Sequence, residues 1–463
     1  MKRAILLLSI ALLVFSCNEQ TVNKIKITKE LRNKDLPYIL EKGKLTVLFE
    51  NNSSSYFEYH GANMGFEYEI LKEFCKDHQL ELDIQIVNDR NEILNLLDNG
   101  EVDLVACNLS VTNDRKKFFA FSAPILHTEQ VLVQRKLDDD NPEDFISDAT
   151  QLAQRKVNVW ENSAYYFKLK NLQNEMGDTI YIYGENGDIS TDYLIEQVAD
   201  GTIDYTVVDK NIAIINQYYW NNLDISVPLS FKQKIAFGLR KSSVKFKAEL
   251  DNWIEQFKES DLYSYLHYKY FELPSTAKLA LNSSDVSNYA TIKKVVTAKT
   301  KGKPFGWQLV SAIIYHESRF NPNIIGLGGA FGLFQFMPST GAIYNVYPSS
   351  SIEEQVDGGV RLIMKNYNLW QNTASDDDRI KFTLASYNSG ASHLHDAIAL
   401  ARKHGLNPNK WNNNVEVMYR KLSSPEYYND PVVKYGASRG LQTVNYVYTV
   451  FERYNQYRNN AQK

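Results

Sequence analysis

The chain has 463 residues with a formal net charge of −4 from 51 basic and 55 acidic side chains. That length exceeds what a single hydrophobic core usually supports, so two or three domains are expected. A composition of 44% hydrophobic and 23% charged residues excludes an intrinsically disordered chain. The near balance of charge lacks the basic excess that is typical of nucleic-acid-binding proteins.

The N-terminus has the layout of a secretory signal. Lys2 and Arg3 precede an apolar run from Ala4 to Phe15, interrupted only by Ser9. This run is shorter than the roughly 20 residues that span a bilayer. Leu13-Val14-Phe15-Ser16-Cys17 resembles a bacterial lipobox, which implies that residues 1–16 are removed and that Cys17 is lipidated. An ordinary signal peptide with a chance cysteine is the alternative.

The residue after the lipidated cysteine bears on localisation. Asn18 is not the Asp that usually retains lipoproteins at the inner membrane. We therefore expect a lipid anchor in the outer membrane, with the protein facing the periplasm. Residues 17–41 are polar and read as a tether.

Strands and amphipathic helices alternate from residue 42 onward. Strands are predicted at 45–49, 82–87 and 102–107, with helices at 68–78 and around 93–97. Alternation of this kind is typical of an α/β fold with a largely parallel sheet. Residues 98–104 (DNGEVDL) resemble 199–205 (ADGTIDY), each reading as a helix end, a glycine cap and a strand. This internal similarity favours two similar lobes, although such turns are also common by chance.

Cysteine and histidine usage gives no sign of a metal or cofactor site. No CxxC pair or Cys/His cluster with ligand spacing occurs. Cys75 and Cys107 could form a disulfide outside the cytoplasm or could be small buried core residues. Both alternatives stay open from sequence alone.

The character of the chain changes around Phe271. Residues 273–288 are rich in breakers and polar residues and are predicted to form a linker. We expect a two-lobed regulatory domain at 42–272 and a mainly helical domain at 289–463. Helices are predicted at 307–316, 353–370, 379–387, 396–404 and 441–457 from their apolar spacing.

Three ordered motifs lie in the first domain: Gly65-Phe66-Glu67-Tyr68-Glu69-Ile70-Leu71, residues 108–124 (NLSVTNDR…FSAP) and Val207-Val208-Asp209. They resemble segments of periplasmic amino-acid-binding proteins, solute-binding family 3, over about residues 42–270. The resemblance implies a two-lobed clamp that closes on a ligand.

The chemistry of an amino acid suits this resemblance. Arg115 would bind the carboxylate and Asp209 the ammonium, because charge-assisted hydrogen bonds favour those pairings. Asn108 and Ser110 would add hydrogen bonds, and Phe66 would wall the pocket. A lobe-internal salt bridge is the alternative role for Arg115. The first loop, residues 53–57 (SSSYF), lacks the family's usual Pro, so a muropeptide fits as well as a free amino acid.

The second domain carries four further ordered motifs: Glu317-Ser318, residues 326–340 (GLGGAFGLFQFMPST), 385–390 (ASYNSG) and 443–447 (TVNYV). They resemble the lytic transglycosylase domain, a fold similar to goose-type lysozyme, over about residues 290–457. Phe334 replaces the usual Met and Gln442 the frequent Glu of that family. The resemblance implies a lyase that acts on peptidoglycan glycan strands.

A single acid marks this segment. Between Val286 and Ile352 the only acidic residue is Glu317. Ordinary glycosidases use two carboxyl groups, about 5 Å apart when retaining and about 6.5–9.5 Å when inverting. One acid suits a reaction in which the substrate provides the nucleophile. A second acid from a later segment would come from Glu353, Glu354 or Asp357.

The resemblance also implies roles. Glu317 protonates the glycosidic oxygen and then deprotonates the C6 hydroxyl, which closes a 1,6-anhydro ring. Such a carboxyl needs a raised pKa, which burial provides. Apolar walls are predicted from Phe331, Phe334, Phe336 and Met337. Substrate contacts are predicted from Ser318, Gly332, Gln335, Tyr387, Asn388 and Tyr446.

The sequence excludes one other function and leaves two alternatives open. His316-Glu317 does not begin a zinc-protease motif, because Phe320 stands where the second His belongs. A hydrolytic lysozyme acting on the same bond is one alternative. A solute receptor with an inert glycan-anchoring domain is the other.

Overall fold

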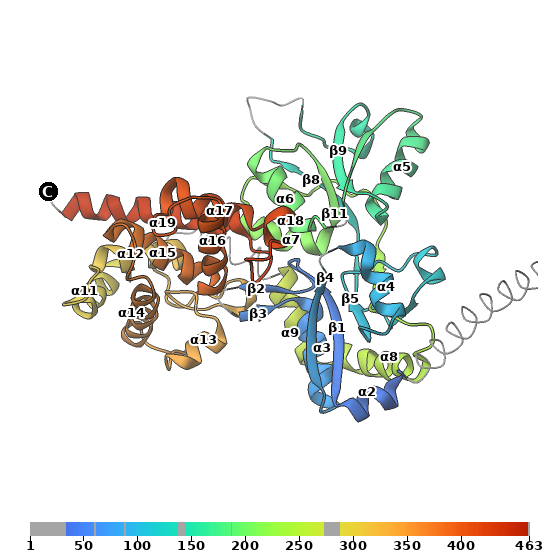
Figure 1. The fold of residues 1–463 in the computed structure, drawn as a ribbon, viewed down its shortest axis with the longest axis horizontal. Coiled ribbons are helices and arrows are strands. Elements are labelled where there is room, and N and C mark those ends of the chain that lie inside the picture. The colour runs from blue at the N-terminus through green and yellow to red at the C-terminus, as the bar shows by residue number, and fades with distance from the viewer. Residues whose placement is uncertain are drawn as a thin grey trace, which may run out of the picture. The chain divides into compact units, whose positions relative to one another are not determined.

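The computed structural model describes residues 34–59, 62–87, 89–137, 144–186, 188–272 and 288–461. The predicted signal 1–16, Cys17 and linker residues 273–287 lie outside the described residues. The chain packs as two compact units (Figure 1). Of the described residues, the first unit contains 34–50, 70–127 and 234–260, and the second contains 51–69, 128–233, 261–272 and 288–461. Within the described ranges, no helix has the length and apolarity to cross a bilayer.

The first unit is built on a five-stranded sheet in the order β4-β1-β5-β14-β6. Its strands are β1 (Lys44–Glu50), β4 (Glu81–Val87), β5 (Leu104–Ala106), β6 (Ala120–Phe121) and β14 (Gly238–Leu239). β1 pairs in parallel with β4 and β5, whereas β14 runs antiparallel. The predicted parallel α/β arrangement is confirmed for this unit.

Helices α2 (Leu36–Lys42), α4 (Ile93–Asp98) and α8 (Val244–Lys258) belong to the same unit, as does most of α3 (Phe66–Asp77). Phe74 of α3 meets Trp253 of α8 edge to face, with ring centroids 5.3 Å apart. Cys75 and Cys107 are both buried, and no disulfide joins the two, so they are small core residues.

The second lobe, residues 128–233, repeats the plan with a sheet ordered β10-β9-β11-β8-β12. Its strands are β8 (Gln130–Arg135), β9 (Lys156–Trp160), β10 (Tyr181–Glu185), β11 (Thr206–Asp209) and β12 (Leu223–Asp224), with helices α5 (Ala164–Met176), α6 (Thr191–Asp200) and α7 (Lys210–Tyr219). α6 ends at Gly201, whose φ of 86° is left-handed, and β11 follows. Gly100 stands between α4 and β5 with a φ of 70°. The similar segments 98–104 and 199–205 thus form equivalent helix-to-strand turns in two lobes.

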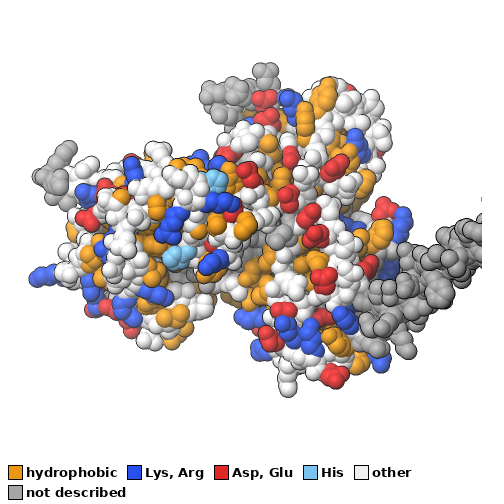
Figure 2. Space-filling model, in the orientation of Figure 1, with side chains coloured by type: hydrophobic (Ala, Val, Ile, Leu, Met, Phe, Trp, Pro, Cys, Tyr) orange, Lys and Arg blue, Asp and Glu red, His pale blue; other side chains and the backbone are white. Residues whose placement is uncertain are grey.

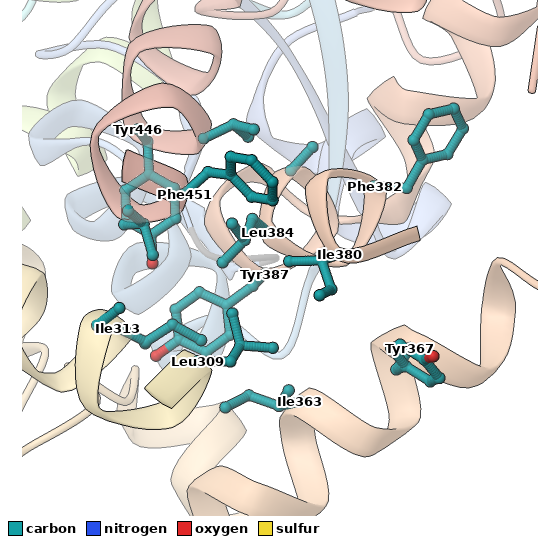
Figure 3. Packing of buried hydrophobic residues seen from close by; sticks show 14 of the residues in the cluster. Leu309, Ile313, Ile363, Tyr367, Ile380, Phe382, Leu384, Tyr387, Tyr446 and Phe451 are labelled. Carbon is teal, nitrogen blue, oxygen red and sulfur yellow. The ribbon is translucent and has the colours of Figure 1, made fainter. Parts of the chain in front are cut away.

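The C-terminal part of the second unit is the mainly helical domain that the sequence predicts. Its helices are α11 (Tyr289–Thr300), α12 (Trp307–Ser318), α13 (Pro338–Ile343), α14 (Ile352–Leu369), α15 (Asp376–Ser389), α16 (Ala391–Lys403), α17 (Glu416–Lys421), α18 (Pro425–Tyr428) and α19 (Gly440–Ala461). We call residues 288–461 the catalytic domain. Helix α19 packs against α12 and α15, and the side chains between these helices form one apolar core (Figure 3).

Local signals set the helix ends. Ser351 and Glu354 form a capping box at the start of α14, and Ser375 caps α15. α12 ends where Arg319 adopts a left-handed conformation with φ 50°. Charged side chains of both signs are interspersed over the visible face (Figure 2), in keeping with the small net charge.

A short hairpin from the N-terminal part of the chain belongs to the second unit. It consists of β2 (Phe57–Tyr59) and β3 (Ala62–Met64). Phe57 pairs with Met64 and Glu58 with Asn63. The hairpin packs against α15 of the catalytic domain, so a segment far away in sequence reaches the neighbourhood of the candidate acid.

Candidate active site

Glu317 lies in the last turn of α12 with its side chain almost fully buried, at 8% exposed. Its Oε1 accepts a hydrogen bond from the Tyr446 hydroxyl of α19 at 2.7 Å. The ring of Tyr446 is stacked 6.4 Å from that of Tyr387 on α15. Three helices therefore meet at this carboxyl.

The pKa of Glu317 is raised to about 8, mainly because the carboxyl is buried. The hydrogen bond from Tyr446 lowers this pKa, but the effect is smaller than that of burial. The place of Glu317 at the C-terminal end of α12 acts in the same direction as burial, because negative charge is disfavoured there. The carboxyl is consequently protonated at neutral pH. It meets the requirement of a general acid whose pKa lies near the working pH.

Glu317 opens into a cavity of about 370 Å³, which we call the catalytic cavity. Its lining combines aromatic rings with amide, hydroxyl and charged groups. The lining residues are Tyr59, Tyr218, Tyr219, Trp220, Asn221, His316, Glu317, Arg319, Asn388, Gln442, Asn445, Tyr446 and Thr449. Amides and aromatic faces are groups that suit an N-acetylated sugar.

Among the residues that the structure describes, Glu317 is the only carboxylic acid that lines the catalytic cavity. The three later acids that the sequence offered are engaged elsewhere. Glu353 and Asp357 form ion pairs with Lys299 at 3.3 and 3.4 Å, and Glu354 caps α14. Glu58 on the hairpin lies 3.9 Å from His393 and does not line the cavity. Neither two-carboxylate geometry is therefore available within this lining.

Two of the six predicted substrate contacts line the cavity beside Glu317, namely Asn388 and Tyr446. Asn388 is oriented by Thr443, whose hydroxyl donates to its Oδ1 at 3.0 Å. The other four, Ser318, Gly332, Gln335 and Tyr387, are buried but absent from the lining.

Three of those four brace the loop that lies against the end of α12. The Ser318 hydroxyl is 3.0 Å from the carbonyl oxygens of Ile314 and Leu333. The Tyr387 hydroxyl donates to the Phe334 carbonyl at 2.5 Å. Gln335 donates to the Gly332 carbonyl at 3.0 Å. We infer that these side chains position the site and do not need to touch the glycan.

Gly332 has a left-handed φ of 72°, and a Cβ built there would come within 2.4 Å of Gln355 Oε1. Gln355 in turn accepts from the Leu333 amide at 2.9 Å. The glycine is therefore required by this close internal packing, with no glycan approach needed to explain it. No motif in the sequence pointed to Gln355.

The predicted apolar walls occupy a different place. Phe331, Phe334 and Phe336 belong to the apolar core of the catalytic domain, and none of them or Met337 lines the catalytic cavity. Tyrosines surround the carboxyl instead. Burial raises the pKa of Tyr59, Tyr218 and Tyr387, and the charge of Glu317 raises it further.

Tyr59, Tyr218, Tyr219, Trp220 and Asn221 were missed because they lie in the N-terminal part of the chain. A run of three aromatic residues at the end of α7 is a visible signal, but nothing local connects it to a domain almost a hundred residues later. Gln442, Tyr446 and Thr449 share one face of α19 by their helical spacing. That periodicity could have identified the α19 residues.

A pH profile follows from the raised pKa. If Glu317 is the general acid and needs its proton at the first step, kcat/KM should hold through neutral pH and fall about tenfold per pH unit above about 8. Tyr446→Phe removes the hydrogen bond that lowers this pKa, so the alkaline limb should move to higher pH. Initial rates of murein solubilisation from pH 5 to 10 measure both. An alkaline limb near pH 4.5 in the wild type would contradict the assignment.

The predicted ligand residues of the regulatory domain fall in both units. In the first, Asn108 is buried with a left-handed φ of 49°. The Arg115 guanidinium donates to the Ser110 carbonyl at 3.1 Å. In the second, Asp209 ends β11 and accepts from the Tyr165 hydroxyl at 3.0 Å. Phe66 is fully buried against Phe271, with ring centroids 4.9 Å apart.

Two family models match the chain. Residues 45–273 match the bacterial extracellular solute-binding proteins, family 3, and residues 294–409 match the transglycosylase SLT domain. Membrane-bound lytic murein transglycosylase F of Desulfosudis oleivorans is 30% identical over 430 residues, which cover 90% of each chain. The protein of that name from Saccharophagus degradans is 27% identical, covering 96% of this chain and 86% of its own.

Solved structures resemble the N-terminal half. An ancestral arginine-binding protein bound to arginine is 21% identical with a TM-score of 0.42. It covers 50% of this chain and 98% of its own.

Proposed function

The chain belongs to the family of membrane-bound lytic murein transglycosylase F, and from this premise we propose how its residues act. The enzyme cleaves the β-1,4 bond between N-acetylmuramate and N-acetylglucosamine of peptidoglycan without water, leaving 1,6-anhydro ends. The observation that carries this proposal is Glu317, a buried carboxyl and, within the described part of the chain, the single acid that lines the catalytic cavity.

Glu317 performs both proton transfers. Its carboxyl donates a proton to the glycosidic oxygen as the bond to C1 breaks, while the N-acetyl group of the substrate assists from within the sugar. The resulting carboxylate then accepts the proton of the C6 hydroxyl as that oxygen bonds to C1. Protons balance, and the acid is restored without water. Tyr446, which donates to Glu317 at 2.7 Å, stabilises the carboxylate between the two steps.

Asn388 and Asn445, which line the cavity, offer amides to the N-acetyl and hydroxyl groups of the glycan. Ser318, Gln335 and Tyr387 hold the loop and the helix end that position Glu317. Gly332 permits the tight packing of that loop. No metal or cofactor takes part in this scheme.

Digestion of purified murein sacculi tests the proposal. Mass spectrometry of the soluble fragments should find anhydromuramyl ends. Reducing ends in their place would favour a hydrolytic lysozyme. A wild-type protein that binds sacculi but releases nothing would favour a receptor with an inert anchoring domain. The relatives and the SLT match favour neither alternative.

We propose that the N-terminal domain binds an amino acid or muropeptide through Arg115 and Asp209, with Asn108, Ser110 and Phe66 contributing to the site. The match to solute-binding proteins, family 3, supports this. Thermal melting of the full chain with free amino acids and with wall peptides tests it. If none of these ligands changes the melting temperature at millimolar concentration, the result contradicts the proposal.

The N-terminal domain also modulates catalysis in this proposal. Tyr59 of the hairpin and Tyr218 of α7 lie in the lining of the catalytic cavity, so movement of these segments changes access to Glu317. A ligand acts this way only by binding one arrangement more tightly than another. Murein lysis measured with and without a ligand found by melting tests this. Equal rates would contradict it.

Membrane association is what the names of the relatives describe. We propose that the attachment is a lipid on Cys17 and that the membrane is the outer one. Cys17→Ser should move the protein from the membrane fraction to the soluble periplasm, and sucrose-gradient fractionation should place the wild type with outer-membrane markers. Retention of the variant in membranes would contradict the lipid anchor.

A further inference from the structure

Among the described residues that line the catalytic cavity, Arg319 is the one with a cationic side chain that could bind an anion. Glu317 is protonated at neutral pH and His316 is neutral, because burial lowers its pKa to about 4. Arginine stays charged throughout this range. A cavity for a neutral sugar backbone has no need of a fixed cation.

The backbone directs this side chain. Arg319 follows α12 directly in a left-handed conformation, with φ 50° and ψ 35°, which is uncommon for a residue other than Gly, Asn or Asp. Its side chain turns back onto α12, where the guanidinium lies 4.1 Å from the centre of the Tyr315 ring. Nη1 also donates to the Tyr315 carbonyl at 3.0 Å. The guanidinium is thus fixed against the end of α12, and Arg319 is among the residues that line the catalytic cavity.

A second arginine approaches the same ring. The guanidinium carbon of Arg453, on α19, is also 4.1 Å from the centre of Tyr315. The two cations are therefore no more than about 8.2 Å apart, twice that distance. Among the residues that the structure describes, no carboxylate forms an ion pair with either arginine. Like charges this close repel each other, and an anion bound to either guanidinium relieves the repulsion.

The substrate carries carboxylate anions close to the bond that is cleaved. In peptidoglycan, the N-acetylmuramate whose bond is cleaved bears a peptide stem with free carboxylates. That stem leaves the sugar within one ring of the atoms on which Glu317 acts. A guanidinium binds a carboxylate through two parallel hydrogen bonds, which fixes orientation as well as charge.

We infer that Arg319, supported by Arg453, binds a carboxylate of the peptide stem and so selects peptide-bearing strands. This inference rests on the proposed function and adds a specificity-determining residue to it. Arg319 does not take part in the proton transfers. Its contribution is to binding, so it is expected in KM more than in kcat.

The test compares native murein with murein whose peptide carboxylates have been converted to neutral amides. Wild-type kcat/KM should be about tenfold higher for native murein, mostly through KM. Arg319→Gln should bring the ratio of the two kcat/KM values close to one. Arg319→Lys, which keeps the charge but not the fork, should give an intermediate ratio. Arg402→Gln, which removes an exposed arginine of α16, should retain the wild-type ratio.

Equal wild-type rates on the two substrates would overturn the inference, whichever variants fold. A ratio retained by Arg319→Gln, or lost equally by Arg402→Gln, would also overturn it. If the wild type lyses neither substrate, the proposed function itself fails. That outcome is distinct from a lysis without preference.

Discussion

Glu317→Gln should reduce the rate of murein lysis by about 10³-fold or more, because positioned acids and bases each contribute roughly 10²–10⁴-fold and this residue serves as both. Glutamine has the same shape, and it can still accept the Tyr446 hydrogen bond. Binding of sacculi in a pull-down assay should therefore survive. Release of fragments from labelled sacculi measures the loss.

Glu353→Gln is the matched control for that change. Glu353 lies on α14 in an exposed ion pair with Lys299, outside the catalytic cavity, and such pairs contribute little. Its variant should lyse murein like the wild type. Substantial lysis by Glu317→Gln would contradict the assignment of the acid.

The expected loss of activity in Glu317→Gln does not come from unfolding, as the linkage between protonation and stability shows. Burial raises the pKa of Glu317 from 4.5 to about 8, so the folded state holds a proton that the unfolded state releases between these values. Stability contributed by this site therefore falls as pH rises from about 4.5 to 8. Glutamine carries no such penalty. Glu317→Gln should melt at or above the wild-type temperature at pH 8, with the difference vanishing near pH 4.

Phe334→Ala should reduce the stability of the catalytic domain by about 3–5 kcal/mol, because it removes a large side chain from the apolar core. Phe334 is 1% exposed. Its ring packs directly on the backbone of α14, since a Cβ built on Gly359 would lie 2.3 Å from Phe334 Cζ. The Phe334 carbonyl also accepts the Tyr387 hydroxyl. Activity should fall together with stability.

Phe334→Met provides the control, because methionine is what the family usually carries there. A flexible apolar side chain of similar volume usually costs less than about 1.5 kcal/mol. The temperature at which lysis activity is lost should drop on the order of 10 °C for Phe334→Ala and much less for Phe334→Met. Equal losses in the two variants would indicate that the volume of this side chain is not what matters.

Local patterns in the sequence predicted the elements well. The alternation after residue 42 corresponds to two mixed sheets that contain parallel strand pairs. The glycine turns after α4 and α6 occupy equivalent positions in two lobes. These signals work because they depend on neighbours in sequence, such as a glycine that can take a positive φ. The domain boundaries 42–272 and 289–463 stay predictions, since residues 51–69 pack with the second unit.

Positions set by long-range packing could not be predicted. Motif resemblance does not separate a residue that lines a cavity from one that braces it, so Asn388 and Gln335 looked alike until the fold showed their surroundings. Phe331 and Phe336 looked like walls for the same reason. Tyr59 and Tyr218 were invisible because only tertiary packing brings them to Glu317.

Digestion of sacculi in water enriched in ¹⁸O tests most directly whether one buried carboxyl does the whole reaction. The account predicts anhydro-ended fragments without heavy oxygen, because the C6 hydroxyl and not water attacks C1. Incorporation of ¹⁸O at C1 of the released muramyl ends would show that water is the nucleophile and would contradict it.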